Sequence, residues 1–552
     1  MTEKENLELA DLLYPNVLDT SFYFDKYKKR TTQGEVTRVA PSPTGYLHIG
    51  QLYQSVIDKM LADKTNGVFY VRLEDTDSKR EVENAGQIAY DMFLKYGITP
   101  DEGYRGNSPE IGDYGPYVQS QRGDIYKSFA KELVKRGKAF PCFCQVINSK
   151  EEILKKREEE LEETNDLEVK DPCRDLTLDE IKVKLSEKKQ FALRLKSCGN
   201  AEKTYQYTDA IKGTKDVREN LKDDVLIKSN GIPVYAFAHV VDDTLMGTTT
   251  VIRGQEWYQS LPVHIELSKA FGFKPFKYAH TPTISVLDEN GNKRKISKRK
   301  DVFADARYFL KQGYPTTAVI EYLLNLINSD FEIWRKNNPT LPYTDFPFDI
   351  KKIGVTNPMF DFLKLNDVSK TIISKMTAEE VYNNALSNAK EWREQDVDVL
   401  EQNKDVLLKV LSIDRGGDRP RKDISVYSEI PTLYDYVLPN FKANFEFELG
   451  NVKKGNLIEF LKEYSNTYKE EIDNQTWFEN LKQISSKHLF VDNKTYKQQP
   501  DAFAGNVSDT SKFVRIAITG KQNSPELYSI MKILGVNECK TRINKLIEFL
   551  EN

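Results

Sequence analysis

One segment near the N-terminus alternates strand and helix signals in the order of a βαβ unit. Residues 36–40 (VTRVA) predict a buried strand, and Pro41 ends it because proline cannot continue a hydrogen-bonded ladder. Apolar residues at four-residue spacing then predict a helix that begins near Gly50, with Gly67 as its left-handed cap. A second apolar strand follows at 68–73, of the kind that parallel sheets bury on both faces. We therefore predict an α/β fold, a Rossmann-like doubly wound parallel sheet, with its ligand site beyond the carboxyl ends of the strands.

The α/β pattern is interrupted once and resumes before the chain becomes helical after Tyr314. The interruption contains a highly charged segment at 150–170 with a helical pattern, and a short strand at 191–195. A chain of 552 residues is expected to divide into several domains, because single cores stop growing near about 250–300 residues. The predicted organisation is an N-terminal extension (1–34), the first half of the Rossmann domain (35–106), an inserted domain (107–220), the second half of the Rossmann domain with a basic loop (221–325), and two helical domains (326–400 and 401–552).

Two further helices are predicted from local signals. Near the C-terminus, Ser524 is expected to cap a helix with Pro525 in its first position and Gly535 closing it. In the N-terminal extension, Leu9, Leu12 and Leu13 are at helical spacing, which predicts an amphipathic segment docked on the body of the protein.

Composition and charge narrow the class of protein. The chain is 39% hydrophobic and 30% charged, so it can build ordinary cores, and its net charge of −4 means that a polyanion would need a local basic patch. It contains no run of 18 apolar residues and its N-terminus has no apolar signal core, so we expect neither a membrane partner nor secretion. Five cysteines are too few for a disulfide scaffold. We expect a cytoplasmic, monomeric enzyme.

Two short segments carry the chemistry. The first, PSPTGYLHIGQ at 41–51, runs from a small-residue loop into the first helix, whose N-terminal amides and His48 can face a phosphate. The second, KRKISKRK at 293–300, has six basic residues of eight and follows a glycine turn, so that Lys295 and Lys298 can neutralise charge that develops on a phosphate. Taken separately, the first is as consistent with a proline-rich turn, and the second with a solvated basic loop or a nucleic-acid patch.

The two segments together resemble the HIGH and KMSKS motifs of class I aminoacyl-tRNA synthetases. The resemblance is closest to the bacterial-type glutamyl-tRNA synthetase family, and it extends to the blocks TRVAPSPTGYLHIG, FYVRLEDTD, VYAFAHVVDDTLMGTTTVIRGQEW and RIAITGKQNSPELYSIMKILG. These blocks cover nearly the whole chain from Thr37 onward. One departure is Gln51, where the HIGH motif ends in histidine.

This resemblance implies that the chain activates L-glutamate with ATP and transfers it to tRNA(Glu). ATP would enter as a substrate together with Mg²⁺. Glutamate carries two carboxylates and one ammonium group, which Arg38, Arg253 and Glu74 are suited to bind. The implied glutamate contacts are Arg38, Ala40, Ser42, Glu74, Tyr235, His239 and Arg253, although His239 departs from the asparagine of some relatives. The implied ATP contacts are Pro43, Thr44, His48, Gly50, Trp257, Ser297 and Lys298. The implied catalytic residues are His48, Gly50, Lys295 and Lys298.

The resemblance also implies what the remaining domains do. The insertion would bind the acceptor arm of the tRNA, residues 326–400 would contact its stem, and residues 401–552 would bind the anticodon. The basic stretch 415–422 is a further tRNA-binding candidate. Because a site built around a polar partner rejects an analogue that lacks it, glutamine should be excluded without a hydrolytic editing domain.

Three cysteines in the insertion raise the question of a metal. Some members of the family bind zinc here, and Cys142, Cys144 and Cys173 with Asp175 offer three thiols and a carboxylate, whereas structural zinc usually has four Cys or His ligands. The alternative is a set of partly buried thiols in a domain without metal.

Several functions remain open on the sequence alone. A glutaminyl-tRNA synthetase shares the catalytic half but has β-barrels where this chain is helical, and a small-substrate nucleotidyltransferase would not need the helical half. A catalytically inactive tRNA-binding paralogue is disfavoured by the presence of His48, Lys298, Arg38 and Glu74. An enzyme that also charges tRNA(Gln) stays an alternative.

Overall fold

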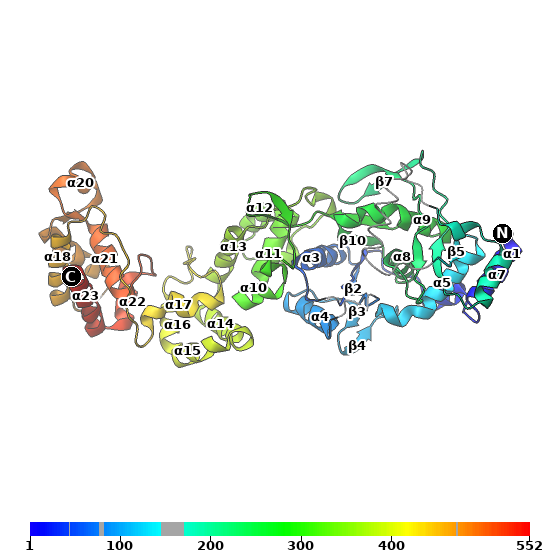
Figure 1. Cartoon of the computed structure of the whole chain (residues 1–552). Coiled ribbons are helices and arrows are strands. Elements are labelled where there is room, and N and C mark those ends of the chain that lie inside the picture. The colour runs from blue at the N-terminus through cyan, green and yellow to red at the C-terminus, as the bar shows by residue number, and fades with distance from the viewer. Residues whose placement is uncertain (44, 77–81, 145–169, 471–472) are drawn as a thin grey trace. The chain divides into compact units, whose positions relative to one another are not determined.

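The computed structural model describes residues 1–43, 45–76, 82–144, 170–470 and 473–552. The described chain forms two compact units, residues 1–308 with 320–361 and residues 309–319 with 362–552 (Figure 1). Thr44 and nearly all of the charged segment predicted as a helix at 150–170 lie outside the described residues.

A twisted sheet in the first unit confirms the predicted βαβ unit. Its strands are β1 (Val36–Val39), β2 (Val68–Val71), β3 (Glu102–Arg105) and β4 (Ser108–Ile111), in that order. β1, β2 and β3 are parallel, and β4 pairs antiparallel with β3. The parallel pair β10 (Thr250–Gly254) and β11 (Lys277–Thr281) lies beside β1, because the amide of Thr249 donates to the carbonyl of Val36 at 3.0 Å. The sheet is therefore wound in both directions from β1, as a Rossmann-like fold requires.

Helix α3 (Ile49–Lys64) connects β1 to β2, but its cap differs from the prediction. The left-handed residue after the helix is Asn66, with φ of 53°, and not Gly67. Gly67 is needed for a different reason, since a Cβ atom there would lie 1.9 Å from the carbonyl oxygen of Glu35. The glycine permits close approach of two backbones at the start of β1.

The inserted segment has a small sheet of its own, and its limits differ from the predicted 107 and 220. β5 (Ala139–Cys142), β6 (Ala192–Leu195) and β9 (Val225–Ile227) form an antiparallel sheet in that order. β9 therefore belongs to this sheet, whereas β4 belongs to the catalytic sheet. Other elements of this segment are the hairpin β7 (Thr204–Asp209) and β8 (Gly213–Arg218), and helix α7 (Leu178–Ser186).

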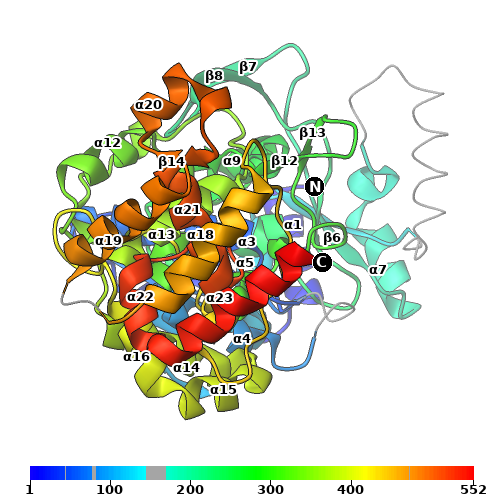
Figure 2. The same ribbon diagram turned by 90° about the vertical axis from the view of Figure 1, so that its left-hand side faces the viewer.

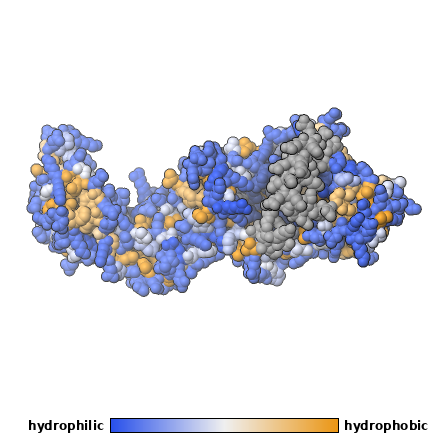
Figure 3. All heavy atoms as spheres, viewed as in Figure 1, coloured by the Kyte–Doolittle hydropathy of each residue, from blue (hydrophilic) through white to orange (hydrophobic). Residues whose placement is uncertain are grey.

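The N-terminal extension is docked on the first unit, as predicted. α1 (Glu3–Leu13) and α2 (Thr20–Lys26) both pack against α5 (Gly123–Lys135). Leu9 and Leu13 of α1 are buried, but Leu12 is on the outer face with 43% of its surface exposed. The face seen in Figure 3 is mainly hydrophilic, and hydrophobic residues gather on it both in the part that carries the N-terminus and in the C-terminal part.

The remaining elements of the first unit include the second motif, the basic segment 293–300. After α4 (Ala85–Lys95), the elements that matter for the site are α8 (Tyr235–Leu245) and α9 (Leu261–Phe271). The segment 293–300, predicted as a loop, begins instead as strand β13 (Lys293–Lys295), which pairs with β12 (Ser285–Leu287) around the predicted turn at Gly291. The chain continues through α10 (Arg307–Gln312), α11 (Thr316–Ile327) and α12 (Asp330–Asn337).

The second unit is helical, as predicted, with one buried core that runs from Ile373 to Leu550. Within it α18 packs along α23 (Figure 2). Its helices are α13 (Phe362–Ser374), α14 (Ala378–Trp392), α15 (Val397–Gln402), α16 (Lys404–Ser412), α17 (Ile430–Leu433), α18 (Lys454–Thr467), α19 (Asn474–Lys487), α20 (Asn493–Gln498), α21 (Val507–Thr519), α22 (Leu527–Leu534) and α23 (Val536–Glu551). Two short strands, β14 (Phe490–Val491) and β15 (Gly505–Asn506), pair in parallel.

Helix α22 begins later than the sequence signals indicated. Glu526 caps it, because its carboxylate accepts hydrogen bonds from the amides of Tyr528 and Ser529 at 2.8 and 2.7 Å. The predicted cap, Ser524, is used elsewhere, since its hydroxyl accepts from Arg515 at 3.1 Å and donates to the carbonyl of Pro525. No helix among the described residues is long and apolar enough to cross a membrane.

Candidate active site

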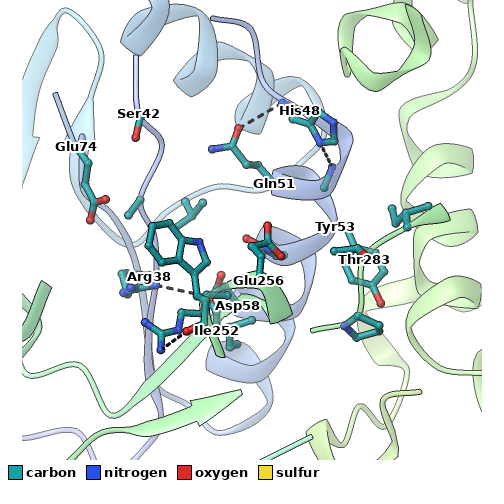
Figure 4. Close-up of a pocket in the computed structure, with 18 of the residues that line it drawn as sticks. Arg38, Ser42, His48, Gln51, Tyr53, Asp58, Glu74, Ile252, Glu256 and Thr283 are labelled. Carbon is teal, nitrogen blue, oxygen red and sulfur yellow. Dashed lines mark hydrogen bonds between the residues drawn. The ribbon is translucent and has the colours of Figure 1, made fainter. Parts of the chain in front are cut away.

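A cavity of about 380 Å³ opens at the carboxyl ends of β1, β2 and β10, where the fold predicts a ligand site (Figure 4). It is also bordered by α3, α8 and the hairpin β12–β13. Most of the predicted site residues line it: Arg38, Ala40, Ser42, His48, Gly50, Glu74, Tyr235, Arg253, Trp257 and Lys295. Pro43, His239, Ser297 and Lys298 are not among the lining residues, and Thr44 lies outside the described part of the chain.

His48 is the N-cap of α3, and its ring is oriented by that role. Its Nδ1 atom accepts a hydrogen bond from the amide of Gly50 at 2.9 Å (Figure 4). Burial, together with the charges of Lys298 and Lys295, lowers the pKa of His48 to about 4. The neutral ring therefore carries its proton on Nε2, and that nitrogen is a hydrogen-bond donor. The first motif thus provides one neutral donor at the start of a helix.

The second motif reaches the first one through Lys298. Its ammonium group donates to the carbonyl oxygen of Tyr46 at 2.6 Å, within the loop that precedes His48. Lys295, at the end of β13, forms an ion pair with Glu256 at 2.9 Å beside the cavity. The turn at 297–301, which contains Lys298, is closed by Asp301, whose carboxylate accepts a hydrogen bond from the amide of Ser297 at 2.8 Å. Two segments about 250 residues apart in the sequence therefore meet at one cavity, as predicted.

Arg38 belongs to a buried charge network centred on Asp243. The Nε atom of Arg38 lies 3.1 Å from Asp243, and Nη1 of Arg72 lies 2.6 Å from the same carboxylate. Burial alone would raise the pKa of Asp243, but the charges of Arg38 and Arg72 outweigh it and hold the pKa well below its ordinary value. Asp243 therefore stays ionised and fixes the guanidinium of Arg38, which faces the cavity (Figure 4).

Glu74 is tied to the same network from the end of β2. Its Oε1 accepts from Nη2 of Arg72 at 2.9 Å. Burial raises the pKa of Glu74, and the charge of Arg72 opposes this shift. Its carboxylate lies at the cavity wall on the side of Ser42 (Figure 4), where it can receive a cationic group.

Arg253 has no carboxylate within 4.0 Å in the described part of the chain. Its guanidinium donates from Nε to Nε2 of His280 at 3.0 Å, contacts Nδ1 of His264 at 3.1 Å, and lies 4.4 Å from the centre of the Tyr278 ring. It is only 3% exposed. A buried cation with neutral neighbours is suited to bind an anionic group of a ligand.

His239 lies behind the cavity and not in it. It is fully buried beneath Tyr235, with the two rings stacked at 5.4 Å. Its nitrogens face Asp243 and Tyr278. The glutamate contact implied for His239 by resemblance is therefore replaced in this structure by contacts to protein groups.

Two polar residues of α3 were missed by sequence reasoning. Asp58 and Tyr53 line the cavity, each about 1% exposed, and neither the Asp58 carboxylate oxygens nor the Tyr53 hydroxyl has a hydrogen-bond partner among the described residues. Burial raises the pKa of Asp58 well above its ordinary value. The sequence did contain one indication of Asp58, because an acidic residue follows Val56 and Ile57 on the apolar face of the predicted helix. Asp242 and Asp243 are a similar case, because an acidic pair inside an apolar run indicates buried charged residues.

The insertion holds a cluster with the composition of a metal site. The ligand atoms of Cys142, Cys144, Cys173 and Asp171 all lie within 4.8 Å of one another. The predicted carboxylate, Asp175, is not in the cluster, because its side chain is exposed and 3.8 Å from Lys196. Asp171 takes its place, since as the cap of a short helical turn it accepts from the amide of Cys173 at 2.8 Å.

A second hollow, of about 560 Å³, lies in the second unit between α19, α21 and α22. Trp477, Phe478 and Arg515 line it, and Phe478 is 37% exposed. Arg515 donates to Ser524 and has no carboxylate within 4.0 Å among the described residues. By contrast, Arg415 and Arg421 of the basic stretch 415–422 donate hydrogen bonds to backbone carbonyl oxygens of their own unit. These two arginines therefore stabilise the fold of the second unit.

Comparison with known proteins agrees with this geometry. The family model for the catalytic domain of class I tRNA synthetases (E and Q) matches residues 35–334, and a model of an anticodon-binding domain matches residues 421–547. A glutamate–tRNA ligase of Acetivibrio thermocellus is 40% identical over 548 residues, which is 98% of this chain and 99% of that protein. One of Clostridium perfringens is 40% identical over 557 residues, with the same coverage of both chains.

A solved structure shows the same fold. The glutamate tRNA ligase of Elizabethkingia meningosepticum, in complex with its amino acid, aligns with a TM-score of 0.72 at 23% identity, over 94% of this chain and all of that one. The predicted fold class is thereby confirmed. From the match of its catalytic half and from relatives similar over nearly its whole length, the chain belongs to the class I tRNA synthetase family of the E and Q type.

Proposed function

We propose that the chain is a glutamate–tRNA ligase that activates L-glutamate with ATP in the cavity and transfers the glutamyl group to the 3′ end of tRNA(Glu). The observation that carries this proposal is the arrangement of two arginines, Arg38 and Arg253, and one carboxylate, Glu74, around a single cavity that also holds His48. This is the charge complement of a dicarboxylic amino acid next to a nucleotide.

The two arginines have unequal surroundings, which supports separate roles. Arg38 is already neutralised by Asp243 and is held in place by it, so it can orient a carboxylate by hydrogen bonds. Arg253 has only neutral neighbours and gains a counter-ion when an anionic group binds. Glu74 receives the ammonium group at the opposite wall. Glutamine in this site would leave one buried guanidinium facing a neutral amide, and such mismatches cost about 10⁴–10⁵ in kcat/KM.

The ATP side of the cavity is formed by His48, Gly50 and Trp257. The Nε2–H of His48 donates to a phosphate oxygen, and Gly50 leaves space at the start of α3 for the nucleotide. Trp257, whose ring lies 4.4 Å from that of Tyr235, provides an aromatic surface for the nucleotide. MgATP enters as substrate, and its phosphates compete with Glu256 for Lys295. The glutamate carboxylate attacks the α-phosphorus, the bond from this phosphorus to the β-phosphate oxygen breaks, and pyrophosphate leaves with its Mg²⁺. Lys298 and Lys295 stabilise the negative charge that develops in this step.

The cysteine cluster fits a structural zinc ion. Tetrahedral zinc with bonds of about 2.3 Å to sulfur places its sulfur ligands about 3.8 Å apart. The sulfur atoms of Cys144 and Cys173 are 3.6 Å apart, and Cys142 lies 3.1 Å from Asp171. Zinc held by Cys142, Cys144, Cys173 and Asp171 would cross-link β5 to the short turn at 172–175.

The hollow in the second unit has the chemistry of a nucleotide-binding surface. An unpaired base can stack on the exposed ring of Phe478, and Arg515 can bind a phosphate or a base edge. We infer that this hollow contacts the anticodon region of tRNA. Phe478→Ala and Arg515→Ala should then raise the KM for tRNA while the KM for glutamate stays constant.

Charging of purified tRNAs with labelled glutamate tests the proposal. Product with tRNA(Glu) alone supports the proposed function as stated. Product with both tRNA(Glu) and tRNA(Gln) supports the broader enzyme that also charges tRNA(Gln). No product with either tRNA, or with total tRNA, would overturn the proposal in favour of an inactive tRNA-binding paralogue.

A further inference from the structure

Three of the five histidines of the chain pack together behind the cavity. His239, His264 and His280 are each fully buried, and all three rings lie about Tyr278. None of them lines the cavity in the described structure. Their role must therefore be exerted through the groups that they contact.

His239 bridges two of these groups with its two nitrogens. Nδ1 lies 2.5 Å from a carboxylate oxygen of Asp243, a close polar contact whose angle falls outside hydrogen-bond geometry, and Nε2 lies 3.0 Å from the hydroxyl of Tyr278. An ionised carboxylate can only accept, so Nδ1 carries the proton. Because burial keeps the ring neutral, Nε2 then accepts from the hydroxyl of Tyr278.

Each end of this bridge leads to an arginine that faces the substrate cavity. Asp243 holds Nε of Arg38 at 3.1 Å. At the other end, the guanidinium of Arg253 lies 4.4 Å from the centre of the Tyr278 ring, at cation–π distance. The path Arg38–Asp243–His239–Tyr278–Arg253 consists of direct contacts at every step.

We propose that His239 is a positioning residue that couples Arg38 to Arg253, and so fixes the spacing of the two carboxylate subsites for glutamate. This inference rests on the proposed glutamate activation. The cost of losing the bridge should fall mainly on glutamate, since the phosphate-side groups His48 and Lys295 have no hydrogen bond or ion pair with the bridge among the described residues. Trp257 touches the bridge at one end, where its backbone carbonyl accepts from Nη2 of Arg253 at 3.4 Å, and its ring takes no part in that bond.

Histidine is suited to this bridge because it presents a donor and an acceptor on opposite sides of one rigid ring. Asparagine can reproduce the contact of Nδ1 but is too short for Tyr278, and glutamine can reach Tyr278 but places no donor at the Nδ1 position. His239→Asn and His239→Gln therefore break the bridge at different ends. Tyr278→Phe breaks it by removing one oxygen while it keeps the ring beneath Arg253.

The experiment measures KM for glutamate and for ATP in tRNA charging by the full chain. His239→Gln loses the close contact with the charged carboxylate of Asp243 and should raise the KM for glutamate about 10- to 100-fold. His239→Asn and Tyr278→Phe each lose the neutral hydrogen bond between the two side chains and should raise this KM about 2- to 10-fold. The KM for ATP should change less than about twofold. The double variant His239→Asn/Tyr278→Phe should be no worse than either single variant, because both remove the same contact.

The controls separate positioning from a merely structural role. Tyr382→Phe removes another buried hydroxyl, one that bonds to the carbonyl of Leu400 in the second unit, and should leave both KM values unchanged. If the variants of His239 raise both KM values together, or if the two single effects multiply in the double variant, the coupling role is overturned. If the His239 variants fail to fold, an unchanged KM for glutamate in Tyr278→Phe overturns it. Failure of the wild-type chain to charge tRNA would instead overturn the proposed function.

Discussion

The Nδ1 atom of His48 accepts a hydrogen bond from the amide of Gly50 at 2.9 Å, so that one side chain both caps α3 and presents Nε2 to the cavity. Asparagine is among the best N-cap residues, but it is too short to reach a phosphate. His48→Asn should therefore leave stability within about 0.5 kcal/mol and lower kcat for adenylate formation about 10²–10³-fold. His48→Ala should lose the same activity and also about 1 kcal/mol of stability. Equal activity of the wild type and His48→Asn would show that Nε2 has no role.

The protonation of His48 gives a second prediction. Because burial and two lysines lower its pKa to about 4, the ring should remain neutral from pH 8 down to about pH 5, with the proton on Nε2. Nitrogen NMR of histidine-labelled protein, with the signal identified by its loss in His48→Asn, measures this directly. A midpoint near 6.5 would contradict it.

Removal of the carboxylate of Asp243 should destabilise the first unit. Asp243→Asn leaves Arg38 and Arg72 buried with less compensating charge, and breaking a buried ion pair in this way costs about 3–5 kcal/mol. Urea denaturation measures the loss. Asp124→Asn is the matched control, because its pair with Lys127 is exposed and worth at most about 1 kcal/mol. Similar effects of the two substitutions would mean that the network does not support the site.

Lys298→Ala should reduce adenylate formation much more than glutamate binding. Its ammonium group is anchored at Tyr46 beside the first motif, where charge develops only during the reaction. Pyrophosphate exchange and equilibrium binding of glutamate give the two values, with Lys300→Ala as the control from the same turn. An equal loss in both values would make the turn a binding surface only.

If the cysteine cluster holds zinc, the zinc content of the protein should depend on Cys144, which belongs to the cluster, and not on Cys198, which does not. Elemental analysis of the purified chain should find about one zinc per chain, lost in Cys144→Ser. Cys198→Ser removes an exposed cysteine outside the cluster and should retain the metal. Absence of zinc from the wild type after purification without chelators would show that the cluster is a set of thiols and not a metal site.

The parts of this protein that were predictable from sequence are those that depend on local pattern. The βαβ unit follows from alternating apolar runs and a proline stop, which also place the ligand site beyond the strand ends. The second motif could be assigned to the same site only through the resemblance of the two motifs together to HIGH and KMSKS, because it begins in an antiparallel hairpin. The partners of Arg38 were not predictable, since Asp243 reaches it only through packing of α8 against the sheet. Asp171 was missed for the same reason: it and Asp175 are each two residues from Cys173, but the fold brings Asp171 to Cys142 while Asp175 is exposed to solvent.

Recognition of a dicarboxylic amino acid by the cavity can be measured by comparing glutamate with glutamine as the amino acid charged to one purified tRNA(Glu). If Arg38, Arg253 and Glu74 together recognise a dicarboxylic amino acid, kcat/KM for glutamate should exceed that for glutamine by roughly 10⁴-fold. Comparable values for the two amino acids would contradict the account, because they would show that the cavity does not read the second carboxylate.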